Sequence, residues 1–135
     1  MSSILIRVDG QPIGKGRPRF GNGRTYTPKR TRDYEARIAH AAQQEVRDSG
    51  WICSEAPVEM EVLAQFEIPK SWTKLKQRTA EQGNIMPARP DIDNVAKAAL
   101  DALNGIVYAD DSQVCKLDVR KRYGLPMLVV LVRIA

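Results

Sequence analysis

The clearest alternation of hydrophobic and polar residues in the chain covers residues 58–68. Its hydrophobic positions are Val58, Met60, Val62, Ala64, Phe66 and Ile68. A period of two predicts a strand with one buried face in a largely antiparallel sheet, because successive side chains of a strand point to opposite faces. Weaker patterns predict further strands at residues 4–8, 114–122 and 127–134.

Other stretches have the spacing of helices. In residues 31–48, hydrophobic side chains recur every four positions and form one stripe. The stripe consists of Tyr34, Ile38, Ala42 and Val46. We expect Thr31 to cap this helix and Gly50 to end it. A second helix is predicted over residues 93–103, and the basic stretch 71–82 can form a short additional one.

These elements predict one α/β (α+β) domain over residues 1–135, in which helices flank a small, mixed, largely antiparallel sheet. The order of the main elements is strand, helix, strand, helix, strand, strand. A chain of 135 residues with 43% hydrophobic residues can form one core. The longest hydrophobic run, residues 127–132, is too short to cross a bilayer, and the first residues do not resemble a signal peptide. We therefore expect a cytoplasmic protein without a membrane partner.

Residues 10–30 are rich in glycine, proline and basic residues, and they predict an exposed, mobile loop. The formal net charge of the chain is +5, and much of the positive charge lies in or beside this loop. Its candidates for contacting a DNA backbone are Lys15, Arg17, Arg19, Arg24, Lys29 and Arg30. A second basic set consists of Lys116, Arg120, Lys121 and Arg122. No glycine-rich phosphate-binding motif is present, so we do not expect a nucleotide cofactor.

Acidic residues form a candidate catalytic motif within residues 91–111. Asp91 and Asp93 stand one residue apart at the predicted start of a helix, and Lys97 follows Asp93 by one helical turn. The connection after this helix can return the chain so that Asp111 joins the other two carboxylates. Three carboxylates without histidine or cysteine suit Mg²⁺ or Mn²⁺, which prefer oxygen ligands. Such an ion can bind a scissile phosphate and activate water, while Lys97 adds positive charge.

Each of these residues also has a structural interpretation. Aspartate at a helix start often caps backbone amides, which contributes about 0.5–2 kcal/mol. Asp110 and Asp111 can simply form a turn. Asp101 lies four residues after Lys97, so an ion pair on the helix surface is its simplest interpretation. Asp101 and Asp110 are thus candidates for supporting the site, not for binding the metal.

The two cysteines and the single histidine provide no further candidates for catalysis or metal binding. Cys53 and Cys115 lack the spacing of a zinc site or a disulfide framework, and we expect buried or partly buried free thiols. His40 lies off the hydrophobic stripe of its helix, so we expect it to be structural or solvated. The chain therefore lacks a credible histidine general base.

The motif PDIDNVAKAALDALNG, followed at short distance by DDSQV, resembles the RusA family of Holliday junction resolvases, small endonucleases common in bacterial prophages. The segments KGRPRF, TYTP and IPKSW are also similar to the family, so the resemblance covers nearly the whole chain. It implies a homodimer that uses Mg²⁺ or Mn²⁺ to make paired nicks across four-way DNA junctions in recombination and repair.

The resemblance also implies roles for individual residues. Asp91, Asp93 and Asp111 match the family's metal-binding, catalytic aspartates, and Lys97 matches its essential lysine. Asp110 aligns with the first aspartate of the DD pair without a clear role. Some members carry a basic residue directly before the first aspartate; here that residue is a proline, and no role is transferred to Arg89, one position further back.

Three alternatives remain open at this point. The chain can be a nuclease for other branched or flapped DNA, with the same chemistry. It can be a basic nucleic-acid-binding module without catalysis, whose aspartates only cap a helix. A phosphatase or nucleotide hydrolase is a third interpretation, and it gains little from the long basic loop.

Overall fold

The computed structural model describes residues 2–135 and confirms the predicted fold class, an α+β fold with a mostly antiparallel sheet. Its elements in chain order are β1 (Ser3–Asp9), β2 (Arg19–Gly21), β3 (Arg24–Tyr26), α1 (Lys29–Ser49), β4 (Val58–Phe66), α2 (Lys74–Glu81), α3 (Ile92–Leu103), the 3₁₀ helix η1 (Asp111–Gln113), β5 (Val114–Tyr123) and β6 (Met127–Ile134). The predicted main elements are all present. The short helix expected within residues 71–82 is confirmed as α2, whereas β2, β3 and η1 were not predicted.

The main sheet has the strand order β1-β6-β4-β5. β6 is antiparallel to both β1 and β4, whereas β4 and β5 are parallel. Strands β5 and β6 are consecutive in the chain but are not neighbours in the sheet, since β4 lies between them. Their connection therefore passes across the end of β4. The Gly124 amide donates to the Phe66 carbonyl at 2.9 Å, and the Gln65 amide group donates to the Leu125 carbonyl at 2.8 Å. These hydrogen bonds hold the β5–β6 connection against the end of β4.

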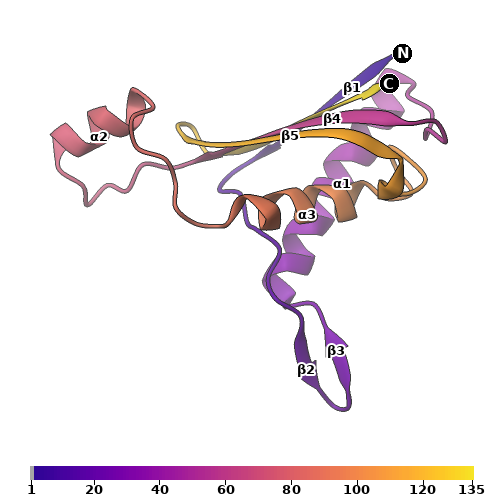
Figure 1. The fold of residues 1–135 in the computed structure, drawn as a ribbon, viewed down its shortest axis with the longest axis horizontal. Coiled ribbons are helices and arrows are strands. Elements are labelled where there is room, and N and C mark those ends of the chain that lie inside the picture. Colours follow the sequence, from indigo (N-terminus) through magenta and orange to yellow (C-terminus); the bar gives the residue numbers. More distant parts are fainter. Residues whose placement is uncertain (1) are drawn as a thin grey trace.

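Helices α1 and α3 cover one face of this sheet (Figure 1). The predicted hydrophobic face of β4 is buried beneath them, with every second residue from Val58 to Phe66 at most 3% exposed. The strand ends at Phe66, two residues earlier than predicted, and the Glu67 amide then binds the side chain of Gln11 at 2.9 Å. The core therefore lies between the sheet and the two helices, and α3 runs along the β4–β5 side.

The predicted cap of the first helix is wrong. α1 begins at Lys29 with Pro28 as its N-cap, and Thr31 lies inside the first turn, buried. The Thr31 hydroxyl instead accepts a hydrogen bond from the Gly16 amide at 2.9 Å. This hydrogen bond therefore ties the basic segment, residues 10–30, to α1. The predicted end is confirmed, since Gly50 has a left-handed φ of 76°.

Residues 10–30 are not simply a loop, because they contain the hairpin β2–β3, which projects from the body of the molecule (Figure 1). Asn22 and Gly23 form its two-residue turn with φ values of 51° and 75°. Asn-Gly suits such a turn because both positions need positive φ. The hairpin lacks a hydrophobic alternation, so the pattern alone did not reveal it.

Two further expectations concern single residues and the membrane. Cys53 and Cys115 are free thiols as expected, but both are exposed, so the prediction of burial is wrong. They lie at the margins of the core, in the connection after α1 and on the edge strand β5. Within residues 2–135, none of the helices has the length and hydrophobicity needed to span a membrane.

Candidate functional site

The start of α3 is held in place by contacts from two other segments. The Lys121 ammonium on β5 donates to the carbonyls of Ala88 and Pro90 at 3.3 and 3.0 Å. From the basic segment, the Lys15 amide donates to the Asn94 carbonyl at 2.8 Å. A Cβ atom at Gly14 would come within 2.5 Å of the Pro90 side chain, so only glycine permits this approach. The first turn of α3 is therefore fixed, while Asp91 and Asp93 are exposed on it.

Most aspartates of the chain have a structural partner. A hydrogen bond or ion pair occupies the carboxylates of five of them: Asp9, Asp33, Asp101, Asp110 and Asp118. Asp110 caps η1 and accepts from the Ser112 amide at 3.0 Å, and this hydrogen bonding lowers the pKa of its carboxyl. Among residues 2–135, the aspartates without a hydrogen bond or ion pair at the carboxylate are Asp48, Asp91, Asp93 and Asp111. Three of these four belong to the predicted site.

The capping interpretation does not account for Asp91. Asp91 occupies the N-cap position of α3, but its side chain makes no capping hydrogen bond. Asp93 lies in the first turn, where the helix dipole favours negative charge. Both carboxylates are therefore available to an external cation. Two carboxylates fit Mg²⁺, which usually binds one or two of them together with waters and substrate phosphates.

Asp111 does not join these two carboxylates within the chain. The C-cap residue Asn104 bridges to Tyr108, and Asp111 follows three residues later. Asp111 also contributes to the raised pKa of Tyr108, after the larger effect of burial. α3 has 12 residues, which corresponds to about 18 Å. Asp111 thus lies at the opposite end of α3 from Asp91 and Asp93.

The expected convergence of three carboxylates in one chain is therefore not found. Across residues 2–135, no three acidic, histidine or cysteine side chains come close enough to hold a metal ion together. The return of the chain after α3 is shorter than the expectation required, because Tyr108 binds back to the last turns of the helix. Its hydroxyl donates to the Leu100 carbonyl at 2.8 Å.

The predicted pair between Lys97 and Asp101 is also replaced. Asp101 binds the Lys15 ammonium at 3.0 Å, and Glu35 on α1 binds the same ammonium at 2.9 Å. Burial lowers the pKa of Lys15, but the bonds and charges of the two carboxylates outweigh it and raise the pKa overall. Lys15 therefore links α1 to α3 with its charge compensated. Lys97 is exposed and, in the described part of the chain, unpaired.

The other predicted DNA-contacting residues lie on or near the projecting hairpin. Arg19 and Arg24 are exposed on its two strands, and Phe20 is 77% exposed. Lys29 pairs with Asp33 on the surface of α1. Arg17 and Arg30 are exposed beside the hairpin and at the start of α1.

The second basic set lies on β5 and is partly occupied by the fold. Lys121 holds the segment before α3, Arg120 pairs with Asp118, and Arg122 binds the side chain of Gln65. The charges of α2 were not among the predicted DNA-contacting residues. Its lobe stands away from the sheet (Figure 1) and carries Lys70, Lys74, Lys76 and Arg78. The run of basic residues in the sequence could have identified these side chains as candidates for DNA contact.

The lobe is attached to the body through an aromatic contact. Trp72 meets Tyr123 at the end of β5 edge to face, with ring centroids 5.3 Å apart. The Lys76 ammonium lies over the Trp72 ring, 4.0 Å from the ring centroid. The start of α3 therefore lies between two basic projections, the hairpin and the α2 lobe (Figure 1).

A small α+β fold with unpaired carboxylates between basic projections has the character of a nuclease. Comparison with known families supports this class: residues 9–134 match the family described as Endodeoxyribonuclease RusA. The chain belongs to this family, and it is therefore assigned to the DNA-cleaving hydrolases. It is also similar to the uncharacterized protein YqaN of Bacillus subtilis (strain 168), with 36% identity over 141 residues, covering 98% of this chain and 97% of YqaN.

Proposed function

We propose that this protein is a metal-dependent, structure-selective endonuclease that resolves Holliday junctions by paired phosphodiester cleavage in DNA recombination and repair. The observation that carries the proposal is the set of carboxylates left without structural partners. Within residues 2–135, no side-chain hydrogen bond or ion pair involves the carboxylates of Asp91, Asp93 and Asp111. Each of the three is exposed or half-exposed. Membership of an endodeoxyribonuclease family supplies the substrate class.

The residues at the start of α3 have distinct roles in this proposal. Asp91 and Asp93 hold Mg²⁺ or Mn²⁺, which when bound supplies a Lewis acid for the scissile phosphate and its attacking water. Lys97 is one helical turn beyond Asp93, so its ammonium lies where it can stabilise negative charge developing on the phosphate. The hairpin and the α2 lobe contact the DNA arms on either side of this point.

The position of Asp111 supports a homodimer in which each site draws on both subunits. If two copies of α3 lie antiparallel about a two-fold axis, the end of one helix meets the start of the other. Asp111 of the partner subunit then supplies the third carboxylate beside Asp91 and Asp93. A symmetric dimer also presents two sites to a four-way junction, whose resolution needs two symmetric cuts.

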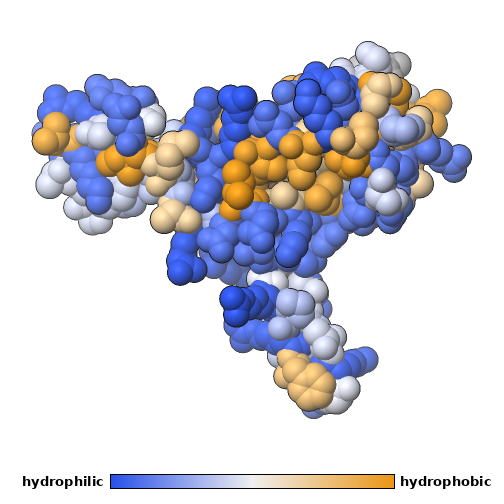
Figure 2. Space-filling model, viewed as in Figure 1, coloured by the Kyte–Doolittle hydropathy of each residue, from blue (hydrophilic) through white to orange (hydrophobic). Residues whose placement is uncertain are grey.

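A surface suited to such a dimer lies beside the site. Figure 2 shows hydrophobic surface between β5 and α3, bordered by polar residues. The exposed hydrophobic side chains that line this part of the surface include Met86 and Ile92, which are 58% and 46% exposed. β5 is an edge strand. A contact here buries hydrophobic area and covers the free edge of the sheet.

The activity is tested by incubating the full-length protein with Mg²⁺ and either a synthetic four-way junction or a linear duplex of the same sequence. We expect symmetric nicks in the junction and little cutting of the duplex. Asp93→Asn should lower cleavage about 100-fold or more while leaving junction binding intact, because it removes a metal-binding charge. Asp48→Asn, at the far end of α1, is the matched control and should cut normally.

Other outcomes separate the alternatives. Equal cutting of junction and duplex contradicts the resolvase assignment and leaves an unselective nuclease. Faster cutting of a flapped duplex than of the junction identifies another branched substrate. Normal cleavage by Asp93→Asn contradicts the metal site, and binding without any cleavage in Mg²⁺ or Mn²⁺ identifies a binding module.

A further inference from the structure

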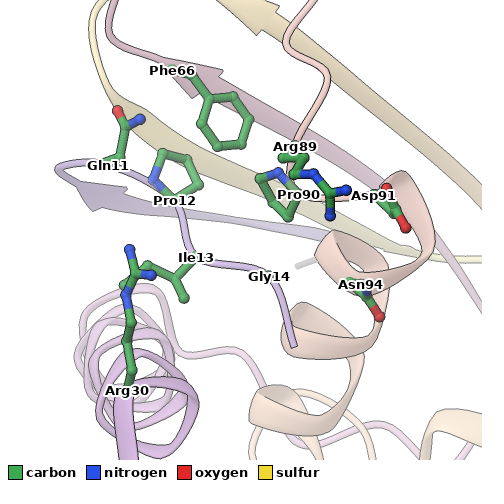
Figure 3. A pocket seen from close by; sticks show the side chains of 10 residues that line it. All are labelled: Gln11, Pro12, Ile13, Gly14, Arg30, Phe66, Arg89, Pro90, Asp91 and Asn94. Carbon is green, nitrogen blue, oxygen red and sulfur yellow. The ribbon is translucent and has the colours of Figure 1, made fainter. Parts of the chain in front are cut away.

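A short stretch of chain, residues 14–16, passes between α1 and the first turn of α3 shortly before the projecting hairpin begins (Figure 3). We refer to these residues as the linking segment. At Gly14 the backbone packs against the ring of Pro90, while Arg30 of α1 lies on the other side of the chain (Figure 3). The linking segment therefore lies against both helices over its short length.

Lys15, in the middle of the linking segment, is bonded to each helix. Its backbone amide donates to the Asn94 carbonyl in the first turn of α3 at 2.8 Å. Its ammonium binds Glu35 on α1 at 2.9 Å and Asp101, about two turns beyond Asn94 on α3, at 3.0 Å. The side chains of Lys15 and Glu35 are 20% and 17% exposed, the lowest values for any ion pair within residues 2–135. Water and salt therefore screen this pair less than the surface pairs.

The linking segment also supports the base of the hairpin. The Gly16 amide donates to the Thr31 hydroxyl on α1 at 2.9 Å. The hairpin forms a two-stranded sheet of its own, separate from the main sheet, and its strands contain no buried residue. Packing of the hairpin strands on the core therefore does not fix their direction. The bonds at the base of the hairpin instead set where it stands relative to α3 (Figure 1).

We propose that Lys15 is a positioning residue, which holds the base of the hairpin against the start of α3 and so sets which phosphate of the bound DNA reaches Asp91 and Asp93. The inference rests on the proposed nuclease function and deepens it. The sequence pattern placed Lys15 among the residues that contact DNA, but its ammonium already has two carboxylate partners. Lys15 thus acts on the DNA through the placement of the hairpin and not by direct contact.

The experiment measures single-turnover cleavage of a four-way junction in Mg²⁺ and reads the position of each nick to the nucleotide. Lys15→Met should lower the rate about tenfold or more and spread the nicks to neighbouring phosphates, because a misplacement of about 1 Å is enough for such a loss. Lys15→Arg should restore cutting at one position, since a guanidinium can also bind carboxylates through several donors. Junction affinity and its salt dependence, measured with Asp93→Asn protein, should hardly change.

Two further variants separate positioning from charge and folding. Gly14→Ala leaves every charge in place, but its Cβ atom would come within 2.5 Å of the Pro90 side chain and displace the linking segment. We expect it to spread the nicks as Lys15→Met does. The triple variant Lys15→Met, Glu35→Gln, Asp101→Asn leaves no unbalanced charge and should spread them as well. It also serves as the test if the single Lys15 variant does not fold.

Arg133→Met is the matched control. Arg133 also binds two carboxylates, those of Glu59 and Glu61, at 3.8 and 3.1 Å, but on the sheet face opposite the helices. Its replacement removes a comparable set of ion pairs without touching the linking segment. Thermal unfolding of all variants measures their stability, and Arg133→Met should nick the junction at the wild-type position.

The other outcomes contradict the proposal in distinct ways. If Lys15→Met weakens binding and lowers the salt slope by about 0.9 while the nicks stay at one position, Lys15 contacts a phosphate directly. If the triple variant cuts like wild type, unbalanced charge explains the effect of Lys15→Met. Cutting at one position by both Lys15→Met and Gly14→Ala likewise shows that the linking segment does not position the DNA. Only failure of the wild-type protein to cut any DNA contradicts the nuclease function itself.

Discussion

Individual side chains in this protein divide into those that the fold uses and those that it leaves free. Lys15 shows the first kind, since two carboxylates on different segments surround its ammonium. Asp91 shows the second, because it occupies a capping position without capping. Asp91 lacks the capping hydrogen bond that would occupy its carboxylate, so this carboxylate is available to bind a cation.

Tyr34 is a buried side chain with a measurable consequence for stability. It is 2% exposed, and its hydroxyl is the buried side-chain oxygen without a hydrogen-bond partner among residues 2–135. Burial raises the pKa of Tyr34 to about 12, although the positive charge of Arg37 opposes the shift. Its ionised form is therefore disfavoured in the folded protein. Arg37 also lies over the ring, 5.7 Å from its centroid.

We expect Tyr34→Phe to be neutral or stabilising by about 1 kcal/mol at neutral pH, because it removes an unpaired buried hydroxyl. A raised folded-state pKa gives stability that is present below pH about 10 and lost as pH rises toward 12, by about 1.4 kcal/mol per unit. Urea unfolding at several alkaline pH values should therefore show a flatter decline for Tyr34→Phe than for wild type.

Tyr108→Phe is the control for the comparison at neutral pH. The Tyr108 hydroxyl donates to the Leu100 carbonyl, so its removal should destabilise the protein at neutral pH by about 1 kcal/mol. Superimposable pH curves for wild type and Tyr34→Phe would contradict the assignment of the alkaline loss to Tyr34.

At the scale of elements, the hairpin β2–β3 and the α2 lobe extend the molecule beyond its core (Figure 1). Neither contributes much hydrophobic burial: the hairpin strands contain no buried residue and α2 buries only Ala80. Elements that add little to the core yet carry concentrated positive charge suit contact with a polyanion. The hairpin is the more accessible of the two to a direct test.

Replacing Arg19 and Arg24 by glutamine should weaken DNA binding and lower the salt dependence. If each guanidinium neutralises one phosphate, the slope of log K against log salt should fall in magnitude by about 1.8. Fluorescence anisotropy with Asp93→Asn protein at several KCl concentrations measures this slope. The glutamine variant at Arg7 and Arg120 removes the same charge from the sheet face opposite the helices and should leave the slope nearly unchanged. Equal effects of the two variants would indicate diffuse electrostatic attraction.

At the scale of the whole molecule, the three candidate metal-binding carboxylates lie at opposite ends of one helix. Asp91 and Asp93 lie at one end of α3 and Asp111 lies at the other. A site shared across a dimer makes activity depend on association. A site confined to one chain does not bring the three residues together. Mixed dimers distinguish the two arrangements.

An equimolar mixture of Asp93→Asn and Asp111→Asn proteins, each inactive alone, should recover nicking after subunit exchange. In a shared site, each mixed dimer has one site with both substitutions and one site with neither. Random exchange then restores about a quarter of the wild-type sites. The products should be single nicks, since paired cuts need two intact sites. Absence of any recovery would show that each site is built within one chain or that the dimer does not form.

The sequence by itself determined the elements whose pattern is local. The alternation in β4 and the stripe of α1 report which face of each element is buried, because that periodicity follows from backbone geometry. The spacing of Asp91, Asp93 and Lys97 likewise places them on the first turns of one helix. For this reason the fold class and the candidate residues on α3 were predictable.

Only the tertiary structure decided which distant segments meet. Local patterns do not show that β4 lies between β5 and β6, that Lys15 and not Lys97 binds Asp101, or that Asp111 stays at the far end of α3. These outcomes depend on how the core packs and how short connections cross it, and each involves residues far apart in the chain. The sequence therefore determined which residues are candidates for chemistry, and packing decided where in space each of them acts.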